Sequence, residues 1–178
     1  MAESNSRPAS ATEAPYTVAL VQKKSTDDYK NVQVFCSGAI IDPEWVLTAA
    51  HCGVFAGTLI TAIAGADNTA QFSDNHVQRR PGKELFKHPS YWENRVSKYD
   101  VALLRVQQRF EFNERVGQAK LWANVWQMAG PKEKHEYGIM DCRGYGWGSL
   151  EIGVPGDSLR TVTLNAGHGT KACSCFKM

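Results

Sequence analysis

The sequence predicts an all-β fold, a barrel or a sandwich, on two observations. Short apolar or alternating runs recur along the chain, and each is typical of a strand. These runs lie at 16–22, 32–41, 45–49, 58–64, 84–88, 101–106, 143–148 and 158–165. Residues that favour turns separate them, as in Asp42-Pro43 and His88-Pro89. Many short strands divided by turn signals are typical of β-barrels and β-sandwiches.

One segment has some helical character. It is "FNERVGQAKLWANVWQM", residues 112–128, and its Gly117 and mixed pattern fit an irregular connector as well as a helix. The stretch 108–125 is therefore expected to link the strands before it to those after it.

Composition excludes several classes of protein. The chain has 178 residues, enough for a sizeable core, and its 43% apolar and 21% charged residues are ordinary for a soluble globular protein. A net charge of +2 does not favour nucleic-acid binding, and the basic cluster "QRRPGK" at 78–83 is expected to be a solvated turn. No apolar run approaches the ~20 residues that span a bilayer, so no membrane segment is expected.

The cysteines and the amino terminus point in different directions. The start, "MAESNSRPASATEAP", lacks the apolar stretch of a secretory signal and, taken alone, predicts a cytosolic protein. That conflicts with the disulfide argued below. No C-x-x-C or paired zinc-site spacing occurs, so no zinc site is expected. The five cysteines are Cys36, Cys52, Cys142, Cys173 and Cys175.

The segment "CSGAIIDPEWVLTAAHC" carries the first candidate site. Cys36 and Cys52 flank a hairpin-like unit, and His51 precedes the second cysteine. A disulfide here would close a loop of ~17 residues and stabilise the fold by about 3 kcal/mol. It would also hold His51 in place, as a general base requires. The alternative is a purely structural histidine beside a disulfide.

Asp100 is the second candidate. It opens the strongly apolar run "VALLRV", where a carboxylate either caps a turn or points inward and needs a partner. A carboxylate that accepts the Nδ1 proton of His51 would be satisfied and would fix the imidazole tautomer. A plain turn aspartate is the alternative.

The order of these motifs resembles the chymotrypsin-like serine proteases, the trypsin family, from about Ala9 to about Cys173. The resemblance implies a double antiparallel β-barrel, with a complete first barrel over 9–110 and an incomplete second barrel over 126–178, in one peptidase-like domain spanning 1–178. It implies His51 as general base and Asp100 as the acid that orients it. The motifs are, in order, "CSGAII", "WVLTAAHC", "HPSY", "YDVALLRV" and "GYGWGS".

The amino terminus departs from the family. The family begins its mature chain with Ile/Val-Val-Gly-Gly, and residues 3–6 here are "ESNS". In the family a freed apolar terminus inserts beside an aspartate and forms the substrate pocket. Glu3 cannot imitate that residue, so this activation switch is expected to be absent or to have been lost at the edge of this chain.

Ser158, in "GVPGDSLRTV", is not expected to be the nucleophile. The family serine lies in Gly-Asp-Ser-Gly-Gly-Pro, whereas Leu159 and Arg160 follow Ser158. The pattern "LRTVTL" instead matches a family strand shortly after Trp147-Gly148, which makes Ser158 a turn residue. A Gly-Asp-Ser-Leu esterase is not expected either, because no alternating α/β pattern is present.

The resemblance therefore implies a serine endopeptidase that lacks, in this chain, its nucleophile, oxyanion hole and specificity pocket, all expected beyond Met178. Cys142 and either Cys173 or Cys175 match positions whose partners lie there too. The chain as written is expected to be inactive. Its implied partners are protein or peptide substrates or protein inhibitors. The resemblance implies no metal or organic cofactor, and it implies an extracellular location. The alternative is a non-catalytic homologue that acts as a binding or decoy protein.

Four further histidines are given no functional role. His76, His88, His135 and His168 have no supporting motif and are expected on the surface or in turns.

Overall fold

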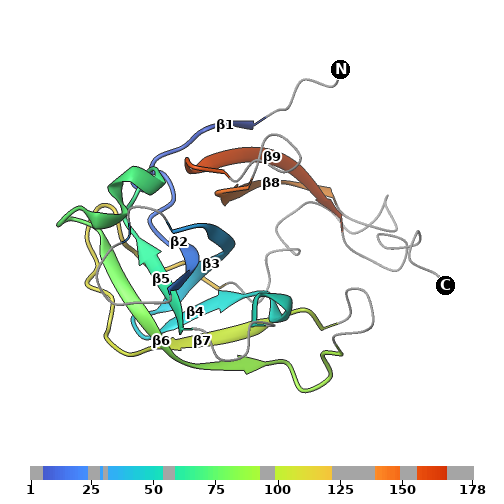
Figure 1. Ribbon diagram of the computed structural model, residues 1–178. Helices are drawn as coiled ribbons and strands as arrows, with labels where there is room; N and C mark the ends of the chain where they lie inside the picture. Colours follow the sequence, from blue (N-terminus) through green and yellow to red (C-terminus); the bar gives the residue numbers. More distant parts are fainter. Residues whose placement is uncertain are drawn as a thin grey trace.

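The computed structural model confirms the all-β class (Figure 1). It describes residues 6–23, 29, 32–53, 59–92, 99–121, 139–148 and 156–167. Within these ranges the regular elements are β-strands and two short 3₁₀ turns, η1 (Ala50–Gly53) and η2 (Thr69–Ser73). No helix in the described ranges is long and apolar enough to cross a membrane.

A closed antiparallel barrel forms the larger part of the described structure. Its strands follow the order β2-β3-β4-β7-β6-β5, so every strand edge is paired. The strands are β2 (Thr17–Lys23), β3 (Val34–Asp42), β4 (Trp45–Thr48), β5 (Leu59–Ala64), β6 (Gln78–Lys87) and β7 (Ala102–Val106).

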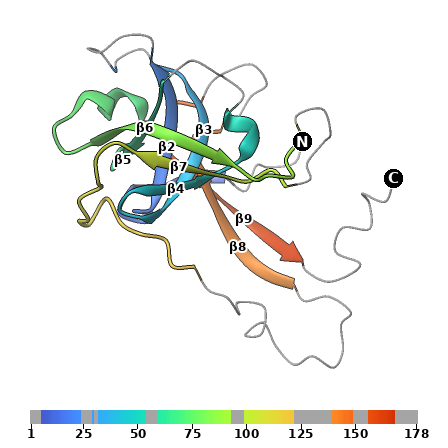
Figure 2. The same ribbon diagram turned by 90° about the horizontal axis from the view of Figure 1, so that it is seen from below.

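A second, three-stranded antiparallel sheet lies beside the barrel (Figure 2). Its order is β1-β9-β8, with β1 (Ser6–Pro8), β8 (Ile139–Gly146) and β9 (Arg160–Gly167). The sequence predicted β8 and β9 to within a few residues but missed β1. Three residues with a proline carry no periodicity, and β1 exists because Ser6 and Pro8 lie opposite Val162 and Arg160.

β2 explains how the two parts share a core. Val18 and Leu20 point into the barrel, whereas Ala19 and Val21 face the second sheet. All four are fully buried. The outward pair packs with a cluster that includes Trp147 and Leu159, so the run "TVALV" is apolar without alternation because both of its faces are covered.

Residues 78–83 correct one expectation. They form the first part of β6 and are not a solvated turn. Pro81 pairs with Thr61, and its carbonyl accepts a hydrogen bond from the Gln107 N–H at 2.8 Å. The register shifts between Gly82 and Glu84, so the turn residues mark a bulge inside a strand.

Gly82→Ala is expected to lower the free energy of unfolding by about 1–3 kcal/mol, the usual cost of overpacking. A Cβ at Gly82 would lie 2.8 Å from Leu104 Cδ1 and 3.0 Å from the Ile60 carbonyl oxygen. Urea denaturation measures the effect. Gly148→Ala is the matched control because nothing lies within 4 Å of its Cβ position. Equal losses in both variants would contradict the packing argument.

The segment 112–121 is an irregular connector, not a helix. Its backbone is hydrogen-bonded to the start of the barrel. The Gly117 N–H donates to the carbonyl of Pro15, just before β2, at 2.9 Å, and the Ala119 N–H donates to the carbonyl of Ile40, in β3, at 2.8 Å. Residues 122–128 of the possible helix lie outside the described residues.

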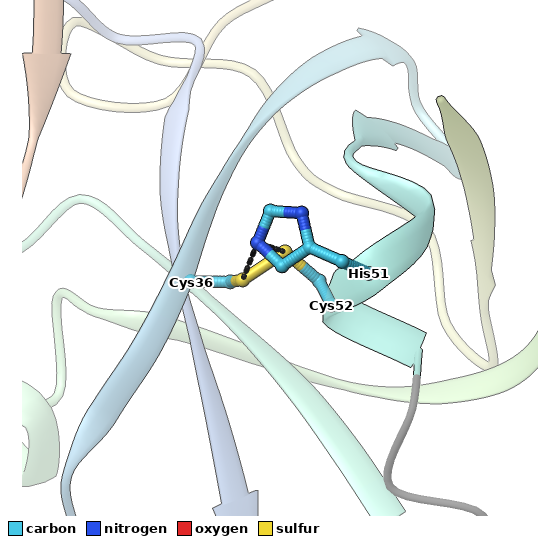
Figure 3. A group of neighbouring side chains, drawn as sticks. All are labelled: Cys36, His51 and Cys52. Atoms are coloured by element: carbon cyan, nitrogen blue, oxygen red, sulfur yellow. Dashed lines mark hydrogen bonds between the residues drawn. A yellow bond between two sulfur atoms is a disulfide. The ribbon is translucent and has the colours of Figure 1, made fainter. Parts of the chain in front are cut away.

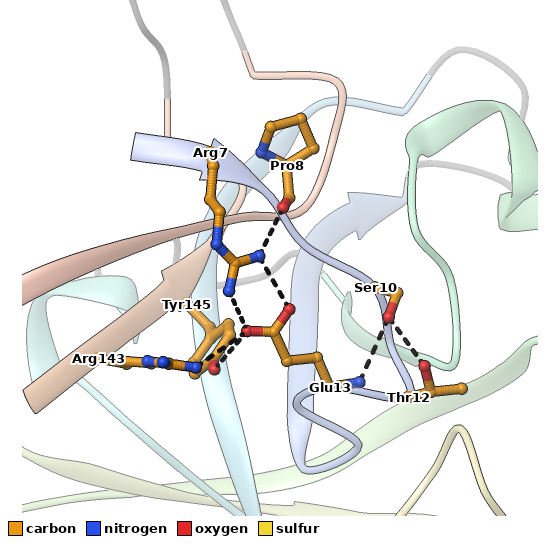
Figure 4. A network of polar contacts seen from close by, with 7 residues as sticks. All are labelled: Arg7, Pro8, Ser10, Thr12, Glu13, Arg143 and Tyr145. Atoms are coloured by element: carbon orange, nitrogen blue, oxygen red, sulfur yellow. Dashed lines mark hydrogen bonds and ion pairs between the residues drawn. The ribbon is translucent and has the colours of Figure 1, made fainter. Parts of the chain in front are cut away.

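A polar network joins the segment between β1 and β2 to β8 (Figure 4). The Glu13 carboxylate accepts two hydrogen bonds from the Arg7 guanidinium, at 2.7 and 3.0 Å. The Tyr145 hydroxyl donates to the same carboxylate at 3.0 Å, and Arg143 lies 3.5 Å from it. Hydrogen bonds from Arg7 are the main reason that the pKa of Glu13 is lowered.

Candidate active site

The register of the barrel strands brings His51 and Asp100 together at the same end of the barrel. β4 and β7 are neighbours, with Thr48 opposite Ala102. His51 lies in η1, just after β4 ends, and Asp100 lies just before β7 begins. Because the two strands are antiparallel, the end of one and the start of the other meet at the same place.

His51 and Asp100 form two hydrogen bonds across 49 positions of sequence, and the predicted contact is present. The ring Nδ1 lies 2.8 Å from Asp100 Oδ2, and the His51 backbone N–H donates to Oδ1 at 2.8 Å. An ionised carboxylate can only accept, so Nδ1 carries the proton. In the neutral ring Nε2 is then the basic atom.

The same contacts keep Asp100 ionised. The hydrogen bond from the His51 ring, followed by the one from the His51 backbone, lowers the pKa of Asp100 below its ordinary value. The His51 side chain is 60% exposed, against 28% for Asp100. The arrangement is therefore a solvent-accessible imidazole backed by a more sheltered negative charge.

The predicted disulfide between Cys36 and Cys52 is present, with a Cα–Cα distance of 6.1 Å. It connects β3 to η1 and lies under the imidazole (Figure 3). His51 Nε2 lies 3.8 Å from Cys36 Sγ and 3.6 Å from Cys52 Sγ. The bridge thus fixes the turn that carries His51 to the neighbouring strand.

Tyr99 and His88, whose contribution to this site was not predicted from the sequence, hold the backbone on either side of Asp100. Tyr99 adopts a φ of 60°, in the left-handed region, and the Val101 N–H donates to the Tyr99 carbonyl at 2.8 Å. The Tyr99 ring stacks on His88, with 4.8 Å between centroids and 9° between planes. The His88 N–H in turn donates to the Val101 carbonyl at 2.9 Å. In the sequence, the one signal for this contribution is that Tyr99 directly precedes Asp100.

A pocket of about 260 Å³ adjoins the disulfide. Its lining comes from both parts of the molecule, so it exists only once the second sheet is seated against the barrel. The lining residues are Val34, Phe35, Cys36, Ser37, Trp147, Gly148 and Gly156.

Ser158 lies in an isolated bridge with Asn68, just before β9. Its hydroxyl donates to Asp157 Oδ1 at 2.9 Å. The next residue, Leu159, is 1% exposed and its N–H donates to the Asp67 carbonyl at 2.7 Å. The hydrogen bond found for the Ser158 hydroxyl is therefore to its sequence neighbour, and Ser158 lies in a bridge at the entry to a strand rather than in the turn that the sequence predicted.

The remaining candidates have simpler surroundings. His76 is exposed and lies 4.0 Å from Asp74, and His88 lies at a turn as expected. Cys142 is a free thiol in β8. Cys173, Cys175, His135 and His168 lie outside the described residues.

Comparisons of the sequence with known proteins assign the chain to a family. The family model described as Trypsin matches residues 4–176. Chymase of Mus musculus is 33% identical over 163 residues, which cover 91% of this chain and 59% of the relative. Chymase of Rattus norvegicus is 32% identical over 151 residues, 84% of this chain and 54% of the relative. The chain thus spans somewhat more than half the length of these relatives, and it belongs to the trypsin family of chymotrypsin-like serine proteases.

Proposed function

We propose that this chain carries the base and the orienting acid of a serine endopeptidase. The observation that supports this most is the double hydrogen bond between His51 and Asp100, which leaves Nε2 as the basic atom. A structural histidine needs only one satisfied nitrogen. Here the carboxylate holds both the ring and the backbone of one residue, and the ring remains exposed.

The proposed roles follow from this geometry. His51 Nε2 accepts the proton of a serine hydroxyl as that oxygen attacks a peptide carbonyl, and it then protonates the leaving amine. Asp100 holds the imidazole in the required tautomer and stabilises the imidazolium that forms. The reaction requires no metal or organic cofactor.

The proposed substrates are proteins and peptides, or protein inhibitors that bind like substrates. We propose that a peptide bound across His51 places one of its side chains in the pocket that Cys36 lines. The disulfide favours an oxidising compartment, so we place the protein outside the cell.

Ser158 is proposed to be a structural residue and not the nucleophile. Its hydroxyl bonds to its neighbour Asp157, and the buried Leu159 occupies the position where the family motif has glycine. Without a nucleophile and the amides that stabilise the oxyanion, residues 1–178 alone are expected not to form an acyl-enzyme.

A fluorophosphonate serine probe should therefore label residues 1–178 no more strongly than it labels the Ser158→Ala and His51→Ala variants. Gel fluorescence measures labelling, with an active chymase as positive control. Labelling of Ser158 that His51→Ala abolishes would show that this exclusion is wrong. Labelling of another serine that depends on His51 would support the base role and locate the nucleophile.

A further inference from the structure

Tyr99, the residue before Asp100, has a backbone conformation that its side chain disfavours. Its φ is 60°, and in the described part of the chain it is the one residue other than glycine with a positive φ. Left-handed backbone brings Cβ too close to the next carbonyl oxygen, so glycine adopts it readily, asparagine and aspartate less often, and bulky residues rarely. A bulky residue keeps this conformation only where its surroundings hold it, and such residues cluster at functional sites.

We propose that Tyr99 and His88 are positioning residues, whose stacked rings stabilise the left-handed backbone that directs the Asp100 carboxylate toward His51. In this proposal neither ring touches the substrate or moves a proton, and both act through Asp100. The catalytic consequence rests on the proposed function, whereas the geometric claim does not.

The Asp100 carboxylate depends on its own backbone for its place. Within the described ranges, the hydrogen bonds found for it come from η1, where the His51 ring and backbone N–H each lie 2.8 Å from one oxygen. An aspartate side chain is short, so the direction of its carboxylate follows the backbone that carries it. Both contacts with His51 therefore require the backbone at Asp100 to be held in one conformation.

That backbone forms a tight turn at the start of β7. The Val101 N–H donates to the Tyr99 carbonyl at 2.8 Å, which closes a γ-turn with Asp100 at its centre. Asp100 has no positive φ, so this is the inverse γ-turn that is common at strand ends, and β7 begins at Ala102. A change of φ at Tyr99 would rotate this turn and carry the carboxylate away from His51.

His88 holds the turn through both its ring and its backbone. Its ring lies nearly parallel to the Tyr99 ring, with 4.8 Å between centroids, and its N–H donates to the Val101 carbonyl at 2.9 Å. The imidazole is itself fixed, because its Nδ1 accepts the Ser90 N–H at 3.1 Å. Tyr99 is 55% exposed, so core packing does not enforce its conformation and the stack supplies a restraint.

The test uses variants that separate the stack from the backbone conformation. Tyr99→Ala and His88→Ala each remove the stack and leave a residue at position 99 that disfavours left-handed backbone. The double variant His88→Ala/Tyr99→Asn also lacks the stack, but asparagine tolerates this conformation, so the geometry is expected to recover. Tyr99→Phe and His88→Phe are the matched controls, since each keeps two rings that can stack.

NMR of the His51 ring nitrogens in residues 1–178, at alkaline pH, measures the geometry without catalysis. The tautomer of a neutral imidazole follows the hydrogen bonds of its nitrogens, so the parent should carry its proton on Nδ1, which faces Asp100. Loss of the stack should lower the ratio of the Nδ1–H to the Nε2–H tautomer by about 2- to 10-fold, the usual contribution of an aromatic pair. Circular dichroism of the same samples reports the fold.

Kinetics on a chain completed with the nucleophile-bearing segment of a chymase tests the consequence. Tyr99→Ala should lower kcat by a similar factor with little change in KM, and the double variant should recover it. An unchanged tautomer ratio in folded Tyr99→Ala and His88→Ala would overturn the proposal, as would a double variant no better than His88→Ala. A lowered ratio with an unchanged kcat would support the positioning role and contradict the proposal that His51 is the base.

Discussion

Asp100→Asn should lower kcat by about 10⁴-fold in a catalytically complete form of this protein, the loss seen when the orienting acid of such a triad becomes an amide. The geometry supplies the reason. The His51 backbone N–H already occupies one carboxylate oxygen, Oδ1, so the amide oxygen of asparagine is expected to take that place. Its NH₂ group then faces Nδ1, which must accept. The ring proton moves to Nε2, and the base is lost.

The experiment compares Asp100→Asn with the matched control Asp74→Asn, which lies beside His76 and away from this site. Steady-state kinetics on a chain completed with the nucleophile-bearing segment of a chymase gives kcat and KM. We expect kcat to fall with little change in KM. In residues 1–178 alone, the low-field N–H resonance of His51 should disappear in Asp100→Asn and persist in Asp74→Asn. An unchanged kcat would contradict the orienting role.

Removal of the disulfide is expected to have the largest effect on stability. Cys36 and Cys52 are 16 positions apart, and a bridge across a loop of this size contributes about 3 kcal/mol, mainly by restricting the unfolded chain. The Cys36→Ser/Cys52→Ser double variant should therefore unfold at markedly lower urea than the oxidised parent. Its barrel is expected to form, because the backbone ladders that close it do not require the bridge, although Cys36 packs against the core and Cys52 is buried.

Cys142→Ser is the matched control, since Cys142 is a free thiol in β8. Urea unfolding followed by circular dichroism gives both free energies, and the reduced parent should behave like the double variant. A double variant as stable as the parent would show that the bridge serves only to position His51.

Local sequence patterns are sufficient to predict the strand-rich class and to single out His51 and Asp100, two residues that the fold brings into contact. The strands of the barrel appear as local apolar patterns, and the motifs around both residues are contiguous. Ser158 could also be judged from its neighbours, because Leu159 stands where the family motif has glycine. Each of these signals lies within a few residues of the feature that it predicts.

Features that depend on pairing between distant segments of the chain are visible only in the folded structure. β1 exists only opposite β9, and residues 78–82 are a strand only because Pro81 and Gly82 meet Thr61 and Val106. The stacking of Tyr99 on His88 and the approach of Nε2 to both sulfurs are likewise set by the register of the barrel. Local periodicity encodes which face of a strand is buried, but not which strand lies beside it, because pairing is chosen by the packing of the whole core.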